Sequence, residues 1–323
     1  MRIVLCYPVE AKHLAQIQAA APQAEIVDAG QNHIARELAE ADIFCGHAKV
    51  PVDWDGAVRR GRLRWIQSSA AGMDHCLVPS VVASDITVTS ASGLLGDQVS
   101  EQALALLLGV LRGLPVFFRA QQKREFIRRP TRDLTEARVL IVGFGGVGRR
   151  IAEVLRPFRP RIFATDMFAV DRPDYVARLL AADRLDELLP EADIVIISAP
   201  LTATTRGMFD ARRIGLMPRG SILINVARGP IVVEQALIDA LESGHLHAAG
   251  LDVTEVEPLP HDSRLWVLPN LILTPHVGGQ SFRRAEQVTD FFAENLRRYQ
   301  AGEPLLNLVD KQLGFPIRTG KPA

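Results

Sequence analysis

The sequence contains few cysteines and no long apolar run. Its 323 residues include only Cys6, Cys45 and Cys76, with no CxxC pair among them. A sparse, odd number of cysteines argues against a disulfide framework and favours a reducing compartment, so we expect a cytoplasmic protein. No stretch approaches the roughly 18 uninterrupted apolar residues of a membrane span. The N-terminus enters directly into a strand-like run without the features of a signal peptide, so we expect neither membrane insertion nor secretion.

The sequence also lacks an excess of charge of either sign. Lysine and arginine total 37, as do aspartate and glutamate, so no overall field steers the protein toward nucleic acid or anionic membrane. The one basic run, residues 119–133, is interrupted by acids, and we interpret it as a solvated or subunit-facing surface. With 48% hydrophobic and 23% charged residues, the composition is that of a globular protein long enough for two domains.

Short apolar runs alternate with helical patterns along most of the chain, which is typical of βαβ units and parallel sheets. In the first third, strands are predicted at RIVLCYP, EIVDAG, DIFCGH, LRWIQSS and ITVTSAS. A second series is predicted at RVLIV, RIFATD, DIVIISAP, SILINVA, AAGLDV and LILTP. Residues 97–114, between the two series, predict one long helix that is apolar on most sides and therefore buried or shared with a partner. We predict an α/β protein with two doubly wound parallel-sheet domains, whose intervening cleft is the natural ligand site.

The segment GFGGVG fits the pattern G-x-G-x-x-G in the context that this pattern requires, between the strand RVLIV and the helical RRIAEVLRPF. Gly143 permits a tight turn, Gly145 lets backbone N–H groups approach a pyrophosphate, and Gly148 allows the helix to pack on the strand. Asp166 stands 18 residues after Gly148, at the end of the next predicted strand, where a carboxylate accepts hydrogen bonds from ribose hydroxyls. Its charge would repel a 2′-phosphate, so the sequence predicts NAD, with some tolerance of NADP left open by the nearby Arg172.

Charged residues follow three consecutive predicted strands of the second series. Arg228 follows SILINVA, Asp252 lies near the end of AAGLDV with Glu257 shortly after it, and His276 follows LILTP. In a doubly wound sheet, ligands bind beyond the carboxyl ends of the strands, so we expect these groups at the cofactor's reactive end. The trio of Arg228, Glu257 and His276 suits hydride transfer to a 2-keto acid. The arginine can hold a carboxylate and polarise a carbonyl, and the histidine can give a proton in a state that an adjacent carboxylate favours.

At these residues the sequence resembles the D-isomer-specific 2-hydroxyacid dehydrogenase family. The stretches that carry the resemblance lie between about residues 65 and 280, in the order SSAAGMDH, VGFGGVGRRIAEVL, SAPLTATTRG, MPRGSILINVARGPIV, ALIDALESGHLHAAGLDVTEVEPLP and LWVLPNLILTPHVGG. The resemblance implies an NAD-dependent enzyme in which Arg228 binds substrate, His276 is the acid/base and Glu257 is its partner. It also implies that the backbone of Ala71 and Gly72 binds the substrate carboxylate.

The resemblance further implies a cofactor site and a domain plan. The implied NAD-binding residues are Gly143, Gly145, Gly146, Val147, Gly148, Asp166, Ala199, Thr205, Val226, Asp252 (toward the nicotinamide amide), His276 and Gly278. The domain plan is a smaller flavodoxin-like substrate domain, residues 1–95 plus 295–323, and a Rossmann NAD-binding domain, residues 96–294. Members of the family are commonly dimers, which suits an apolar helix at residues 97–114.

The leading hypothesis is therefore reduction of a small 2-keto acid, such as glyoxylate or hydroxypyruvate, to the D-2-hydroxy acid. Formate is disfavoured, because Glu257 stands where the formate dehydrogenases of this superfamily have glutamine. A non-enzymatic NAD-sensing scaffold of the corepressor type is the alternative, and a methyltransferase does not explain the Arg, Glu and His positions. His245 and His247 lack an evident third ligand, so no metal site is predicted.

Overall fold

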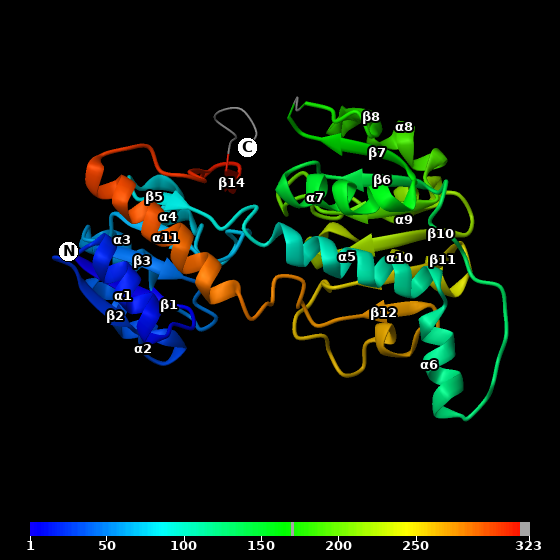
Figure 1. The fold of residues 1–323 in the computed structure, drawn as a ribbon, viewed down its shortest axis with the longest axis horizontal. Helices are drawn as coiled ribbons and strands as arrows, with labels where there is room; N and C mark the ends of the chain where they lie inside the picture. The colour runs from blue at the N-terminus through cyan, green and yellow to red at the C-terminus, as the bar shows by residue number, and fades with distance from the viewer. Residues whose placement is uncertain (169–170, 317–323) are drawn as a thin grey trace. The chain divides into compact units, whose positions relative to one another are not determined.

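The computed structural model describes residues 1–168 and 171–316, and the chain divides into two compact units. Unit 1 comprises Met1–Leu95 and Ser281–Ala323, and unit 2 comprises Gly96–Gln280. The chain thus returns to unit 1 at Ser281, earlier than the expected residue 295. The reason is that α11 (Arg284–Ala301) belongs to unit 1 over its whole length and packs along α1 (Ala11–Ala20), as Figure 1 shows.

The five-stranded sheet of unit 1 is entirely parallel, in the order β2-β1-β3-β4-β5. Its strands are β1 (Arg2–Cys6), β2 (Glu25–Asp28), β3 (Ile43–Gly46), β4 (Trp65–Ser68) and β5 (Thr87–Thr89). Every residue of β3 and β4 is buried, which is why β3 reads in the sequence as an apolar run, whereas β4 ends in the buried polar residues Gln67 and Ser68. A short antiparallel pair, β13 (Val309–Asp310) and β14 (Phe315–Pro316), follows α11. The order is that of the flavodoxin-like fold, as predicted.

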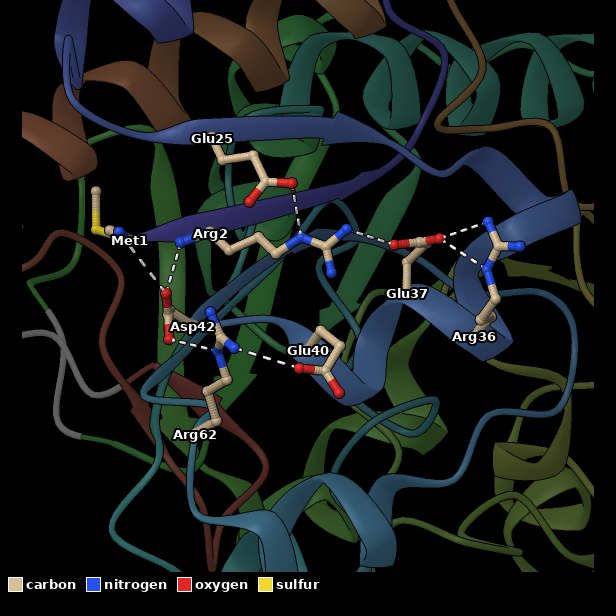
Figure 2. Close-up of polar contacts among 8 residues, drawn as sticks. All are labelled: Met1, Arg2, Glu25, Arg36, Glu37, Glu40, Asp42 and Arg62. Carbon is tan, nitrogen blue, oxygen red and sulfur yellow. Dashed lines mark hydrogen bonds and ion pairs between the residues drawn. The ribbon is translucent and has the colours of Figure 1, made fainter.

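Ion pairs occupy the amino edge of this sheet (Figure 2). The guanidinium of Arg2 contacts Glu25 at 3.1 Å and Glu37 at 2.7 Å, and so joins the first residues of β1 and β2 to α2 (Gly30–Glu37). Asp42, just before β3, accepts a hydrogen bond from the backbone N–H of Arg2 and pairs with Arg62 at 3.0 Å. Burial raises the pKa of Asp42, but the Arg2 N–H and Arg62 outweigh it and hold that pKa below its usual value. Ion pairs thus connect β1, β2, α2 and the segment before β3 at this edge.

The seven-stranded sheet of unit 2 is also entirely parallel, in the order β12-β11-β10-β9-β6-β7-β8. Its strands are β6 (Arg138–Val142), β7 (Arg161–Asp166), β8 (Val176–Ala181), β9 (Ile194–Ile197), β10 (Ser221–Asn225), β11 (Leu246–Leu251) and β12 (Leu271–Leu273). The chain reverses direction across the sheet between β6 and β9, so the ends of these two strands form the switch point at which such sheets bind dinucleotides. The predicted α/β class with two parallel sheets is confirmed.

Both faces of this sheet are covered by helices. On one face, α5 (Gly96–Leu111) and α7 (Gly146–Leu155) pack against alternate residues such as Val139 and Ile141. Helices on the other face bury Leu140 and Phe163 instead. The remaining helices of four or more residues are α3 (Trp54–Arg60), α4 (Pro79–Ala83), α6 (Leu114–Gln122), α8 (Leu185–Leu188), α9 (Ala211–Leu216), α10 (Glu234–Glu242) and the 3₁₀ helix η6 (Arg264–Val267).

The long helix predicted for residues 97–114 ends earlier than expected, at Leu111. Gly113 has a φ of +71°, in the left-handed region, and α6 starts directly after it at an angle of 67° to α5. Within residues 1–168 and 171–316, no single helix is long and apolar enough to cross a membrane, and α5 with α6 reaches that length only as this bent pair.

Candidate active site

The glycine loop after β6 shows which glycines the protein needs for its own packing. A Cβ at Gly143, whose φ is +91°, would lie 2.6 Å from the backbone nitrogen of Ala199, and one at Gly148 would lie 2.0 Å from the Gly143 oxygen. A Cβ at Gly145, in contrast, would meet no heavy atom within 4 Å in the described part of the chain. The first and third glycines are therefore required by the fold, whereas the second leaves open space of the kind that a bound pyrophosphate fills.

The start of α7 supplies the donors for such a ligand. Gly145 is the residue before the helix, and Gly146, Val147 and Gly148 form its first turn. The N–H groups of a first turn have no partner within the helix, and the helix dipole favours an anion there. The loop therefore fits the phosphates of a dinucleotide.

Asp166 ends β7 beside this loop, as the sequence predicted. Its two carboxylate oxygens accept hydrogen bonds from the backbone N–H of Phe144, at 2.6 Å, and of Phe168, at 2.9 Å. The carboxylate thus ties the glycine loop to the end of β7 while its remaining lone pairs can serve a ribose. The sequence predicted only that Asp166 binds the cofactor ribose. Its hydrogen bond from the Phe144 N–H is a structural role that was not predicted.

Four further predicted cofactor residues lie at the same edge of the unit 2 sheet. Ala199 and Thr205 follow β9, Val226 follows β10, and Gly278 follows β12. Ala199 and Val226 are each 8% exposed, and the Thr205 hydroxyl lies 2.7 Å from the Pro200 carbonyl oxygen. The structure therefore brings them to the edge where the glycine loop lies; their contacts to a cofactor stay predictions.

The three proposed catalytic residues also come together at this edge. Nδ1 of His276 lies 2.7 Å from Oε2 of Glu257, and the Thr254 N–H donates to Oε1 of the same carboxylate at 3.1 Å. Arg228 follows β10. The backbone of the next residue, Gly229, packs closely against the loop at Thr254, because a Cβ at position 229 would lie 1.8 Å from the Thr254 carbonyl oxygen.

The electrostatics of Glu257 connect all three groups. Burial raises the pKa of this carboxyl, but the hydrogen bond and charge of His276, the Thr254 N–H and the charge of Arg228 outweigh it. The pKa of Glu257 is therefore held below its usual value, so the group is a carboxylate at neutral pH. A guanidinium, a carboxylate and an imidazole thus interact at one site.

Asp252 has a structural role that the sequence did not reveal. Its side chain is 2% exposed, and its oxygens accept from the N–H groups of Val277 at 3.0 Å and Gly278 at 2.8 Å and from the hydroxyl of Thr274 at 2.7 Å. The carboxylate therefore holds the loop that carries His276. Its expected contact with a nicotinamide amide stays a prediction.

Three features of this loop were missed by sequence reasoning. Thr274 and Gln102 were not singled out; the Gln102 amide lies 2.8 Å from the Thr274 hydroxyl and so supports it from α5. His276 itself has a φ of +54°, an uncommon backbone conformation for a residue other than glycine. Such strain persists only where surrounding contacts enforce it, here the bond of its N–H to the Asp252 carbonyl oxygen at 2.7 Å.

Ala71 and Gly72 belong to unit 1, in the loop after β4. Ser69, two residues before Ala71, has its carbonyl oxygen held by Arg284 of α11 at 3.2 Å. The role of Ala71 and Gly72 in binding a substrate carboxylate stays a prediction.

Metal ligation has no structural support among the described residues. No group of three or more His, Cys, Asp or Glu side chains in residues 1–168 and 171–316 is arranged to hold an ion. His245 instead places Nε2 3.0 Å from the Ile214 carbonyl oxygen.

Comparison with known proteins agrees with this geometry. The family model described as the NAD binding domain of D-isomer specific 2-hydroxyacid dehydrogenases matches residues 104–278. A glyoxylate reductase of Pyrococcus horikoshii is 31% identical over 298 residues, which cover 89% of this chain and 87% of that protein.

Solved structures match both units. A D-isomer specific 2-hydroxyacid dehydrogenase from Xanthobacter autotrophicus, in complex with NADPH and MES, has a TM-score of 0.81 and 32% identity, and the match covers 97% of this chain and 99% of that one. An NADPH-dependent glyoxylate/hydroxypyruvate reductase from Sinorhizobium meliloti, in complex with NADP and sulfate, has a TM-score of 0.82 and 28% identity over the same shares.

The fold and the site define an oxidoreductase that uses a nicotinamide dinucleotide. More specifically, the chain belongs to the D-isomer specific 2-hydroxyacid dehydrogenase family. It is thus an NAD(P)-dependent enzyme of keto acid and hydroxy acid oxidoreduction.

Proposed function

We propose that this enzyme interconverts a small 2-keto acid and its D-2-hydroxy acid, with NAD as the preferred cofactor and His276 as the acid/base. The observation that carries the proposal is the 2.7 Å contact between His276 and Glu257 at the sheet edge that also carries Arg228 and the glycine loop. These are the charges that reduction of a keto acid requires, since the substrate is an anion and its carbonyl oxygen must gain a proton.

The contact with Glu257 gives the two ring nitrogens of His276 different roles. Because Nδ1 faces Glu257, Nε2 is the nitrogen that exchanges a proton with the substrate oxygen. In the imidazolium form, Nδ1–H donates to the carboxylate and Nε2–H donates to the carbonyl oxygen. After Nε2 has given its proton, Nδ1–H stays on Glu257, and Nε2 is the base that the reverse reaction needs.

Arg228 binds the substrate in this scheme. Its planar guanidinium can donate two parallel hydrogen bonds to the keto acid, which positions the carboxylate and polarises the neighbouring carbonyl. The backbone N–H groups of Ala71 and Gly72 are proposed to bind a substrate carboxylate. NADH, when bound at the glycine loop, would supply the hydride for the carbonyl carbon.

The preference for NAD rests on Asp166. A 2′-phosphate placed near its carboxylate would be repelled, and the Phe144 and Phe168 N–H groups hold that carboxylate in place. The two relatives of known structure described above carry NADPH or NADP, so the fold alone does not decide between the cofactors, and the preference proposed here depends on Asp166.

We propose small substrates because two similar proteins are named as reductases of small 2-keto acids, one of glyoxylate and the other of glyoxylate and hydroxypyruvate. The test is an assay of NADH and NADPH oxidation with glyoxylate, hydroxypyruvate, pyruvate and 2-oxobutanoate. We expect turnover of at least the smallest substrates, faster with NADH, and D configuration in the products that have a stereocentre, which are those from all the substrates except glyoxylate. Cofactor binding without turnover across the panel would overturn the proposal.

We further propose a homodimer in a reducing compartment such as the cytoplasm. The apolar side chains of α5 are used within unit 2, since Leu106, Leu107 and Val110 are at most 3% exposed. Exposed apolar side chains follow instead on α6 and the next segment: Leu114, Phe118, Phe126 and Ile127. Exposed apolar side chains of this kind, two of which lie within the basic run of residues 119–133, are typical of a subunit contact. Analytical ultracentrifugation tests the dimer, and a monomer at micromolar concentration would contradict it.

A further inference from the structure

A small pocket lies at the amino edge of the unit 2 sheet, the edge opposite to the one that carries the catalytic residues. Its volume is about 250 Å³, below the roughly 300–1,000 Å³ of pockets for drug-sized ligands, so it suits an ion or a small metabolite. The end of α5 supplies an apolar wall, with Val110 and Leu111. The polar side chains that line the pocket come from the basic run and from β11: Arg129, Thr131, Arg132 and His247.

The basic run is held against the turn between α5 and α6. The N–H of Arg132 donates to the Leu111 carbonyl at 3.0 Å, and a Cβ at Gly113 would lie 3.9 Å from Nη2 of Arg129. The Arg132 guanidinium donates to the carbonyl of Gly220, just before β10, at 2.5 Å. This bond uses one of the five N–H groups of the guanidinium and leaves the others for a ligand.

His247 enters the pocket from an irregularity in the sheet. Ser221 of β10 pairs with Leu246 of β11, and the next residue, Ile222, pairs with Ala248, so His247 is the extra residue of a bulge. Bulges redirect a side chain and are frequent beside functional sites. The imidazole is half-buried, among the side chains that line the pocket.

The electrostatics of His247 report an unbalanced positive charge. Burial, followed by the charges of Arg132 and Arg129, holds the pKa of this imidazole below its usual value. His247 is therefore neutral at neutral pH, and the two guanidinium groups give the pocket its charge.

Nearby acids do not neutralise these two guanidinium groups. Asp133 pairs with Arg112 at 3.0 Å, and Asp193, which feels the charge of Arg132, pairs with Arg138 at 2.7 Å. In the part of the chain that the structure describes, no carboxylate lines the pocket. Two cations at one half-buried pocket without a counter-charge attract an anion.

We propose that this pocket binds a phosphate group, either as inorganic phosphate or as the phosphate monoester of a small metabolite. A phosphate monoester carries a charge of about −1.5 to −2 at pH 7, which matches the two guanidinium groups. Guanidinium groups can also pair with phosphate oxygens through two parallel hydrogen bonds. The Thr131 hydroxyl and the His247 ring N–H are further donors. The site is separate from the catalytic residues and does not depend on the proposed function.

The test is isothermal titration of phosphate into the enzyme saturated with NAD, at constant ionic strength in chloride. Bound NAD keeps phosphate from the glycine loop. We expect saturable binding with a Kd of about 1 mM or less, weakened about tenfold or more by Arg129→Gln and by Arg132→Gln. Arg128→Gln, an exposed arginine one residue away that does not line the pocket, is the matched control.

The same titration with glycerol 3-phosphate distinguishes the two sources of the phosphate group. Tighter binding than that of inorganic phosphate identifies a monoester as the ligand, and weaker binding identifies the free ion.

A second measurement reports on the pocket itself. The pKa of His247 is followed by NMR, with His247→Gln to assign the signal. Phosphate should raise this pKa, because the bound anion offsets the two cations that disfavour the imidazolium. An unchanged pKa at saturating phosphate would contradict the proposal.

Absence of saturable binding up to about 10 mM phosphate would overturn the proposal. Equal losses in Arg128→Gln and Arg129→Gln would also overturn it, since they would indicate only a general positive field. A loss confined to Arg228→Gln would assign the phosphate to the substrate site instead. None of these results depends on keto acid turnover, so the proposed function is tested separately.

Discussion

Nδ1 of His276 lies 2.7 Å from Oε2 of Glu257, although the two residues follow different strands of the sheet. Arg228 adds its charge to the same carboxylate, which therefore keeps a pKa below its usual value despite burial, the largest influence on it. The interaction of Glu257 with His276 also stabilises the folded protein, in a way that depends on pH. Because the folded-state pKa of Glu257 is lowered, this contribution is present above the ordinary carboxyl pKa and is lost as the pH falls through the lowered value.

Glu257→Gln should lower kcat for keto acid reduction. The neutral amide no longer supplies the negative charge that faces Nδ1 of His276 at 2.7 Å, so the ring is less well oriented and less well balanced in charge while Nε2 transfers the proton. At neutral pH we expect kcat for reduction to fall by about tenfold or more. The measurement is the pH profile of kcat with glyoxylate, and Glu255→Gln, a change two residues away, is the control. A profile that coincides with the wild type would refute the pairing.

Asp252→Asn should loosen the loop that carries His276. An amide nitrogen cannot accept, so at least one of the bonds from Val277, Gly278 or Thr274 is lost in a side chain that is 2% exposed. We expect the free energy of unfolding in urea to fall by about 1–3 kcal/mol, together with kcat. The exposed Asp262→Asn should change neither, and an Asp252→Asn enzyme of full stability would contradict the assigned role.

Gly145→Ala and Gly148→Ala should affect different properties, the first NADH affinity and the second stability. A Cβ at 145 meets nothing within 4 Å in the described residues, so this variant should retain its Tm but bind NADH about tenfold or more weakly, as the methyl group occupies ligand space. A Cβ at 148 would lie 2.0 Å from the Gly143 oxygen, so the second variant should lose about 1–3 kcal/mol of stability. Thermal unfolding and NADH titration separate the two effects. Equal NADH affinity in Gly145→Ala and the wild type would exclude this loop as the pyrophosphate site.

Asp166→Ala should reduce the preference for NADH over NADPH. The substitution removes both the acceptor for ribose hydroxyls and the charge that repels a 2′-phosphate, and we expect the ratio of the two kcat/KM values to fall by about tenfold or more. Asp171→Asn, an exposed carboxyl five residues away, is the control. An unaltered ratio would mean that cofactor selectivity resides elsewhere.

The sequence predicted most strands of the sheets because buried parallel strands are short apolar runs. Ile43–Gly46 and Ile194–Ile197 are clear examples, since every residue of each is buried. It missed β8, an edge strand with only Val176 fully buried, whose residues carry little periodic signal. It also predicted one helix across Gly113, since a lone glycine is tolerated within helices and only its φ of +71° marks the break.

For the site, charged residues after strands were informative because parallel strands end at one edge. The contacts of Asp252 could not be predicted in this way. They join residues 22 to 26 positions apart through a loop conformation, with His276 at positive φ, that no local pattern specifies.

The central claim is that His276 exchanges the proton, and the most direct measurement is the rate of NADH oxidation with glyoxylate by His276→Gln. The account predicts that kcat falls by about 10²–10⁴-fold while circular dichroism shows the folded protein, with His261→Gln, an exposed histidine of the same unit, as active as the wild type. A His276→Gln enzyme that retains kcat within about threefold of the wild type would contradict it, because general acid catalysis contributes far more than that.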